Sequence, residues 1–152
     1  MVPGSRVSNL AADLHAALTA ARKSKDKDRT QLLGTVLAAL KNREIELRRA
    51  PTDEDTLDVL QKGVKLRREA LELYVKGDRE DLAERERSEI RIIEEFLPPA
   101  ADPEEIRAAV RAAIAAGAAD LGKVMGRVVP QFKGRADGKV IQQIVRAELS
   151  LG

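Results

Sequence analysis

Residues 52–78, with the sequence TDEDTLDVLQKGVKLRREALELYVKGD, carry the pattern of a long helix. Thr52 and Asp55 approximate a capping box, in which each side chain accepts a backbone N–H group at the helix start. The apolar residues that follow are mostly three, four or seven positions apart: Leu57, Leu60, Val64, Leu71 and Tyr74. This spacing places them on one face, so the helix should pack along much of its length until Gly77 and Asp78 break it.

Similar patterns predict three more helices in the first part of the chain. One should run from about Ser8 to Lys23. Another should begin near Asp28 as its N-cap and end at Ala50, because Pro51 disfavours helix at the residue before it. The fourth helix should end before the double proline at residues 98–99. Short links make consecutive helices antiparallel neighbours, so the four helices should form a bundle or a pair of hairpins.

A domain boundary is expected at residues 98–102, which divides the chain into residues 1–97 and 98–152. The second part should be a small domain of three helices. Its predicted N-caps are Asp102, Asp120 and Asp137. An aspartate side chain at such a position accepts one of the free N–H groups of the first turn. Gly117 should end the first of these helices, and Pro130 should kink or shorten the second because it lacks an N–H group.

The composition predicts an all-α protein. Of the 152 residues, 43% are hydrophobic and 34% are charged, but only 2% are aromatic. Strands favour aromatic and β-branched residues, so a core of Leu, Ile, Val and Ala indicates helices. The absence of cysteine excludes disulfide bonds, thiol catalysis and zinc–thiolate sites, and it fits a reducing compartment. No apolar stretch could span a membrane or act as a signal peptide, so a cytoplasmic protein is expected.

Few residues in the sequence could carry out catalysis. His15 is the only histidine, and a catalytic imidazole needs a nucleophile or an orienting partner. The glutamates between residues 84 and 95 alternate with arginines, which indicates a solvated ion-pair face instead of a metal or acid/base site. Residues 134–140, GRADGKV, have three residues between the glycines and valine after the lysine, whereas a P-loop needs four and then Ser or Thr. No catalytic residue, metal or cofactor is therefore expected.

Basic residues are concentrated towards the C-terminal end of the sequence. Residues 121–152 contain six basic and two acidic groups, which gives this segment a net charge of +4. Five of the basic residues lie on or after the predicted sixth helix: Lys123, Arg127, Lys133, Arg135 and Lys139. Together with the N-terminus of the last helix they could form a phosphate-binding surface. From the residues alone, it is equally plausible that the glycines only turn the chain and the basic groups only keep it soluble.

The kind of nucleic acid that such a surface would bind follows from the scarcity of aromatic residues. Single strands are usually bound through bases stacked on aromatic side chains. Phe132 is the only aromatic residue in the basic segment, and core packing is its expected role. A nucleic acid would therefore be bound through its backbone and shape, which suits a structured RNA.

The basic segment also resembles the GatB/YqeY family. The family's signature is similar to GKVMG at residues 122–126, a helix with a proline, and KGRADG at residues 133–138. Similar stretches occur at residues 38–46, AALKNREIE, and at residues 96–98, FLP. The resemblance covers nearly the whole chain. One departure is Gly34, where the family often has arginine, so a role of that arginine has no counterpart here.

The resemblance implies an all-α fold with a helical N-terminal domain and a three-helix tail. The tail is similar to the terminal domain of the B subunit of tRNA-dependent glutamine amidotransferase, which helps to hold the outer corner of tRNA. By this resemblance the residues that would face RNA phosphates are Lys123, Arg127, Lys133, Arg135 and Lys139. The first hypothesis is therefore a non-catalytic tRNA-binding module, an accessory to tRNA-dependent amidation or to other tRNA maturation, with a protein of the translation or amidation machinery as a further partner.

Two alternatives stay open from the sequence. The basic surface could bind an acidic protein, which would make the chain a protein-interaction adaptor. By family analogy alone, the chain could also be a carbon–nitrogen ligase with glutamine as amido donor. That reaction needs an activated nucleophile, and neither one nor an ATP site is evident in the sequence. We therefore expect no catalytic activity in the isolated chain.

Overall fold

The computed structural model describes residues 9–151, and every regular element within this range is a helix. The prediction of an all-α fold is thus confirmed. Contacts between Cα atoms divide the chain into two compact units, which we call unit 1 (Met1–Leu97) and unit 2 (Pro98–Gly152). The predicted start of the first helix near Ser8 lies outside the described residues.

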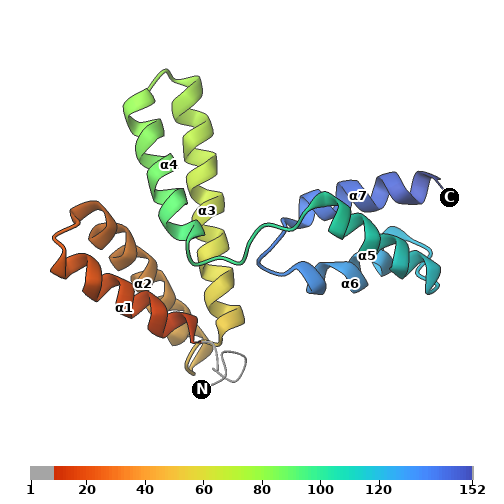
Figure 1. Cartoon of the computed structure of the whole chain (residues 1–152), viewed down its shortest axis with the longest axis horizontal. Helices are drawn as coiled ribbons and strands as arrows, with labels where there is room; N and C mark the ends of the chain where they lie inside the picture. Colours follow the sequence, from red (N-terminus) through yellow and green to blue (C-terminus); the bar gives the residue numbers. More distant parts are fainter. Residues whose placement is uncertain (1–8, 152) are drawn as a thin grey trace. The chain divides into compact units, whose positions relative to one another are not determined.

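Unit 1 consists of four helices, α1 (Leu10–Lys23), α2 (Lys27–Leu47), α3 (Asp53–Lys76) and α4 (Glu80–Glu94). Figure 1 shows that α1 and α2 form one helical hairpin and that α3 and α4 form another. Of the two arrangements expected from the sequence, the pair of hairpins is therefore the one adopted. The short links force each helix to run antiparallel to the one before it.

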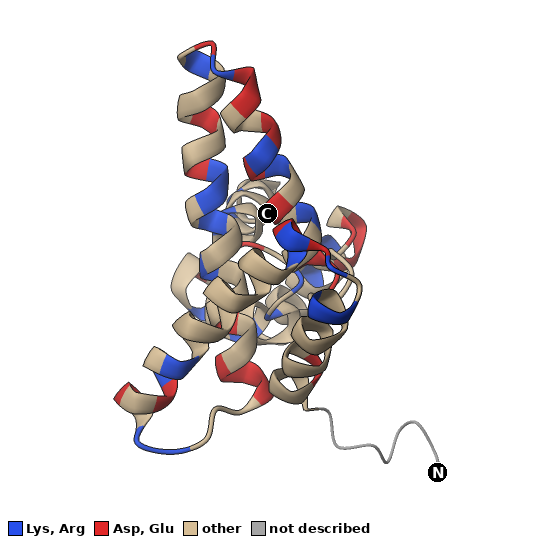
Figure 2. Ribbon diagram, turned by 90° about the vertical axis from the view of Figure 1, so that its left-hand side faces the viewer, with Lys and Arg blue, Asp and Glu red and all other residues tan. Residues whose placement is uncertain are grey.

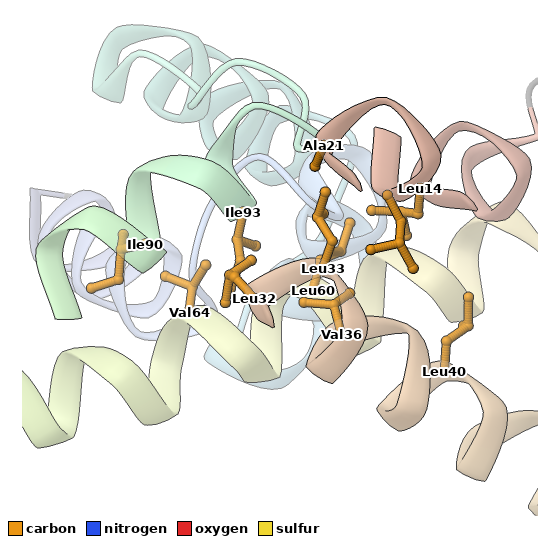
Figure 3. Packing of buried hydrophobic residues seen from close by; sticks show 11 residues of the cluster. Leu14, Ala21, Leu32, Leu33, Val36, Leu40, Leu60, Val64, Ile90 and Ile93 are labelled. Carbon is orange, nitrogen blue, oxygen red and sulfur yellow. The ribbon is translucent and has the colours of Figure 1, made fainter. Parts of the chain in front are cut away.

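The core of unit 1 draws on all four helices. Leu14, Leu33, Leu60 and Ile93, one from each helix, are at most 1% exposed. Figure 3 shows these side chains together with neighbouring leucines, isoleucines and valines from the same helices. Burial of such side chains contributes about 1.5–3 kcal/mol each before conformational entropy is subtracted. The α1–α2 hairpin is thus held on the α3–α4 hairpin by one shared hydrophobic cluster.

Helix ends in unit 1 follow the local signals in most places. Asn9 caps α1, Thr52 and Asp55 form the predicted capping box of α3, and Gly77 is the C-cap of α3. The two ends of α2 differ from expectation. Asp26, not Asp28, is the N-cap, because its side chain accepts the N–H group of Arg29 at 3.1 Å.

The other end of α2 comes three residues earlier than expected. The helix stops at Leu47, and Arg48 adopts a left-handed conformation with φ 57°. Pro51 restricts the residue before it, and Thr52 must be extended to cap α3. The turn from α2 to α3 therefore needs the residues that the sequence pattern assigns to the end of α2.

The start of α3 carries a compact network around Asp55. Its carboxylate accepts hydrogen bonds from the Arg49 guanidinium at 2.8 Å and from the Thr52 N–H group at 2.9 Å. The hydrogen bond from Arg49, followed by that from Thr52, lowers the pKa of Asp55 from 3.8 to about 2. The network ties the α2–α3 turn to the first turn of α3.

This network predicts acid sensitivity of unit 1. Because the pKa of Asp55 is lower in the folded chain, its contribution to stability is complete above the unfolded value of 3.8 and is lost as the pH falls towards about 2. As the pH falls through this interval, the free energy of unfolding should decrease less in Asp55→Asn than in the wild type. Urea unfolding followed by circular dichroism on both sides of this window measures the difference, and equal losses in both proteins would contradict the prediction.

Unit 2 contains α5 (Pro103–Ala115), α6 (Leu121–Val128), a 3-10 helix (Val129–Phe132) and α7 (Gly138–Leu151). Its core consists of residues that are at most 6% exposed: Ile106, Val110, Ala113, Ala118, Val124, Val128, Phe132, Ile141 and Val145. The predicted caps at Asp102 and Asp120 are present, and Gly117 follows α5 with φ 108°. Left-handed geometry of this kind suits glycine, since it has no Cβ atom.

The charged face of α4 matches the ion-pair interpretation of the sequence. Figure 2 shows basic and acidic residues interspersed along the α3–α4 hairpin. Arg87 pairs with Glu80 at 2.5 Å, and Arg91 pairs with Glu84 at 3.0 Å. Exposed pairs of this kind contribute little to stability individually. Within residues 9–151 no group of three or more acidic or histidine side chains is arranged to hold a metal ion.

Candidate nucleic-acid interface

Helix α6 presents two basic side chains on its solvent-exposed side. Asp120 caps the helix by accepting the N–H group of Lys123 at 2.9 Å. Val124 and Val128 are fully buried, whereas Lys123 and Arg127, one turn apart, are exposed. The helical spacing that buries the valines thus directs both basic side chains to solvent. The helical spacing of these four residues in the sequence is enough to predict this placement.

The basic groups of α6 differ in their surroundings. The Lys123 ammonium lies 4.0 Å from the Asp120 carboxylate, and both side chains are more than 60% exposed. Arg127 donates a long hydrogen bond of 3.5 Å to the carbonyl of Ala116 at the end of α5. Arg127 forms no ion pair with any of residues 9–151. Its charge is therefore available to an anion in solution.

The proline in this segment has the effect that the sequence predicts. Helix α6 ends at Val128, and the 3-10 helix that contains Pro130 follows directly. A proline cannot donate the hydrogen bond that would continue the α-helix. The 3-10 helix ends at Phe132, whose side chain is only 4% exposed. Phe132 therefore belongs to the core of unit 2 and cannot stack on a base.

Arg135 has a role that the sequence did not predict. Its guanidinium donates two hydrogen bonds to Glu105 on α5, at 2.9 and 3.0 Å, and a third to the carbonyl of Pro99 at 3.2 Å. Its own carbonyl accepts the N–H group of Ala101 at 2.8 Å. The hydrogen bond between the two side chains lowers the pKa of Glu105 and raises that of Arg135. Arg135 thus connects residues 99–105 to the turn at Gly134, and its charge is balanced by Glu105.

Removal of this connection should destabilise unit 2. Arg135→Gln loses the bidentate pair with Glu105, so we expect a lower urea midpoint for unit 2, with a smaller effect than that of truncating a core side chain. Glu105→Gln should lower the midpoint by a similar amount. The double variant should lose less stability than the two single losses added together, because both changes remove the same interaction. Hydrogen exchange of the α5 and α7 amides reports on unit 2 specifically. Full additivity of the two single changes would contradict the pairing.

The start of α7 contributes Lys139 but not a free helix N-terminus. Asp137 caps this helix as predicted, since its carboxylate accepts the N–H group of Lys139 at 2.9 Å. This carboxylate therefore already accepts one of the N–H groups of the first turn that could bind an external anion. The side chain of Lys139 is exposed, and it forms no ion pair with the described residues. Lys133, in the turn before α7, is also exposed.

Of the five residues named from the sequence, four are exposed and the fifth, Arg135, is paired with Glu105. Lys123 and Arg127 share one face of α6, and Lys133 and Lys139 lie exposed before and at the start of α7. Arg135 is separate from them because it is turned to Glu105. Local helix spacing was enough to find the exposed residues. No local signal identifies Glu105, thirty residues earlier, as the partner of Arg135.

The single histidine lies away from these residues in the sequence and has a plain environment. His15 is exposed on α1, and its backbone carbonyl accepts the hydroxyl of Thr19 at 3.1 Å. His15 is thus a solvent-exposed helix residue. None of the described helices is both long enough and apolar enough to cross a membrane.

The model of the Yqey-like protein family matches residues 11–149. The chain belongs to this family. The family resemblance noted in the sequence is thereby confirmed over nearly the whole length of the chain.

Similar curated proteins come from fungi. An uncharacterized protein of Schizosaccharomyces pombe is 36% identical over 94 residues, which cover 62% of this chain and 76% of that protein. The altered inheritance of mitochondria protein 41 of Lachancea thermotolerans is 38% identical over 107 residues, 68% of this chain and 55% of its own length. Its counterpart in Pyrenophora tritici-repentis is 29% identical over 145 residues, 89% of this chain and 80% of that protein. The chain thus spans about half the length of several of these relatives, among them that of Lachancea thermotolerans.

The comparison corrects one expectation. The relatives from Lachancea thermotolerans and Pyrenophora tritici-repentis are named as mitochondrial proteins, so the expectation of a cytoplasmic protein is wrong. The reasoning behind it could not separate the two compartments. Lack of cysteine fits any reducing compartment, and mitochondrial transit segments are amphipathic instead of apolar.

Proposed function

We propose that this member of the YqeY-like family is a non-catalytic RNA-binding module whose unit 2 contacts the phosphate backbone of a structured RNA, tRNA in the first place. The observation that carries the proposal is the exposure of Lys123 and Arg127 on one face of α6, together with that of Lys139. Neither Arg127 nor Lys139 forms an ion pair with a described carboxylate. Cations in this state release counterions from nucleic acid on binding, and that release drives the association.

The chemistry of unit 2 favours backbone contacts over base contacts. Phe132 is buried, so this unit has no exposed aromatic ring among its described residues for stacking. Phosphate contacts position a protein on a nucleic acid without reading its sequence. A folded RNA presents dense phosphates in a fixed shape, which lysine and arginine side chains on short rigid helices can match.

The likeness of the tail to the terminal domain of the amidotransferase B subunit supports tRNA as the RNA and tRNA-dependent amidation as the setting. The role there is that of an accessory, because the sequence contains no cysteine nucleophile and its one histidine, His15, is exposed on α1. The amidotransferase would supply the catalytic parts. Amidation of glutamyl-tRNA by that enzyme, measured with and without this chain, tests the setting separately from binding.

Binding itself is tested with the full chain and fluorescently labelled tRNA. Fluorescence anisotropy should show an association constant that falls linearly with salt on a double-logarithmic plot, with a slope of about −0.7 to −0.9 per phosphate contacted. An unstructured RNA of the same length should bind more weakly. Absence of salt-dependent binding at micromolar protein would refute the proposal. A partner retained after ribonuclease treatment, in place of RNA, would favour the adaptor function instead.

A further inference from the structure

The turn between α1 and α2 is a second concentration of positive charge, far from unit 2 in the sequence. Residues 22–29, RKSKDKDR, contain five basic and two acidic groups and carry a net charge of +3. The rest of unit 1 sums to −3, so unit 1 is neutral overall. A balanced surface with one strongly cationic end is the pattern of a site that attracts an anion.

Only one of the five basic groups forms an ion pair within residues 9–151. Arg29 pairs with Glu95 at the end of α4 at 2.9 Å and lies over the ring of Phe96. The remaining four are exposed and form no ion pair with any of residues 9–151: Arg22, Lys23, Lys25 and Lys27. Of the two acids, Asp26 is engaged as the N-cap of α2. With Arg29 paired to Glu95, residues 22–28 keep four basic and two acidic groups, a net charge of +2 at this turn.

Two of these lysines stand where the local backbone favours other residues. Lys25 has φ 59°, a left-handed conformation that suits glycine or asparagine. Lys27 is the first residue of α2, where the helix dipole favours an acidic side chain. Residues that break local rules without a visible structural gain are typical of functional sites. Local stability therefore does not explain the basic side chains at these two positions.

The hairpin brings the four cations together at one end. Figure 1 shows the α1–α2 turn at the end of this hairpin opposite to the α2–α3 connection. Arg22 and Lys23 are in the last turn of α1, and Lys27 is in the first turn of α2. Packed helices lie about 8–10 Å apart, and a nucleic-acid duplex carries one charge per about 1.7 Å of its axis. A patch of this width therefore faces several phosphates at once.

We propose that the α1–α2 turn is a second phosphate-contact site for the same structured RNA that unit 2 binds, an inference that rests on the proposed function. Lys25 and Lys27 touch the backbone most directly, and Arg22 and Lys23 extend the contact along α1. A membrane surface fits the turn less well, because binding there also needs apolar side chains that enter the lipid. The large exposed hydrophobic residues of the described chain begin only at Ile45.

The test compares two full-length variants with equal changes in charge. The turn variant replaces the four free cations: Arg22→Gln, Lys23→Gln, Lys25→Gly and Lys27→Gln. The control variant removes four exposed lysines elsewhere in unit 1: Lys41→Gln, Lys62→Gln, Lys65→Gln and Lys76→Gln. The turn variant should bind labelled tRNA at least about tenfold more weakly than the control at low salt, with a salt slope smaller by roughly two to four.

A single substitution separates binding from stability. Lys25→Gly fits the left-handed backbone, so it should leave the unfolding midpoint unchanged or raise it while it weakens tRNA binding. If Lys25 has a structural role instead, Lys25→Gly should lower the unfolding midpoint and leave tRNA binding unchanged.

The possible failures are distinguishable. If wild type binds tRNA and the turn variant matches the control, the second site is refuted and the proposed function stands. If wild type does not bind tRNA, both proposals fall. If the turn variant loses binding only to vesicles that contain anionic lipid, with tRNA binding intact, the assignment of RNA to this turn is overturned.

Discussion

Replacement of Phe132 by alanine should unfold a measurable fraction of unit 2 at room temperature. The Phe132 side chain is 4% exposed and belongs to the hydrophobic cluster of unit 2. Truncation of a buried phenylalanine costs about 3–5 kcal/mol. A domain of about 55 residues has a total stability of roughly 3–8 kcal/mol, so the loss is comparable to the whole. The large effect follows from the small size of the unit.

Hydrogen exchange measures this effect where it occurs. Amides of α5 and α7 in Phe132→Ala should exchange much faster than in wild type, and the urea transition of unit 2 should move to lower concentration. Lys139→Ala is the matched control, because its side chain is exposed and substitutions of this kind change stability by about 0.5 kcal/mol or less. Unchanged protection in Phe132→Ala would show that the ring is not part of the core.

The outcome also bears on how the unit would hold RNA. A ring that maintains the core cannot be offered to a base, so stacking would require partial unfolding of unit 2. Contacts through exposed lysine and arginine side chains require no such rearrangement. The burial of Phe132 thus stabilises unit 2 and also leaves phosphate contacts as its proposed mode of RNA binding.

Local signals in the sequence were sufficient for most of the fold. The caps at Thr52, Asp102, Asp120 and Asp137 involve residues within three positions of one another, so a short stretch contains all the necessary information. The same is true of the end of α6 before Pro130. The end of α2 was misjudged because the turn into α3, which reaches as far as Thr52, decides where the helix must stop.

In the candidate site, too, the features that depend on local helix spacing were predictable from the sequence. Helix spacing alone exposes Lys123 and Arg127, and both are exposed. The pairing of Arg135 could not be predicted, because its partner Glu105 lies on another helix and the sequence does not distinguish Glu105 from the neighbouring Glu104. Only the packed fold shows that Glu105 and the Pro99 carbonyl are within reach of the same guanidinium.

Charge reversal at Lys123, Arg127 and Lys139 together should have the largest effect on RNA binding. In the variant Lys123→Glu, Arg127→Glu and Lys139→Glu each contact with a phosphate is replaced by repulsion. Loss of three phosphate contacts lowers the salt slope by about three. With repulsion added, we expect the affinity for tRNA at low salt to fall by roughly a hundredfold or more. Arg135 is kept unchanged in this variant, since its reversal would disrupt the pair with Glu105 and confuse stability with binding.

A second triple variant separates the site from the total charge. Lys62→Glu, Lys65→Glu and Lys76→Glu change the net charge by the same amount at exposed positions of α3. Because electrostatic attraction acts over about 8 Å at physiological salt, cations outside the interface should contribute little. Anisotropy titrations at several salt concentrations, with helicity checked by circular dichroism, compare the two. Equal losses in both variants would mean that tRNA responds to overall charge, and α6 and α7 would then have no special part in binding.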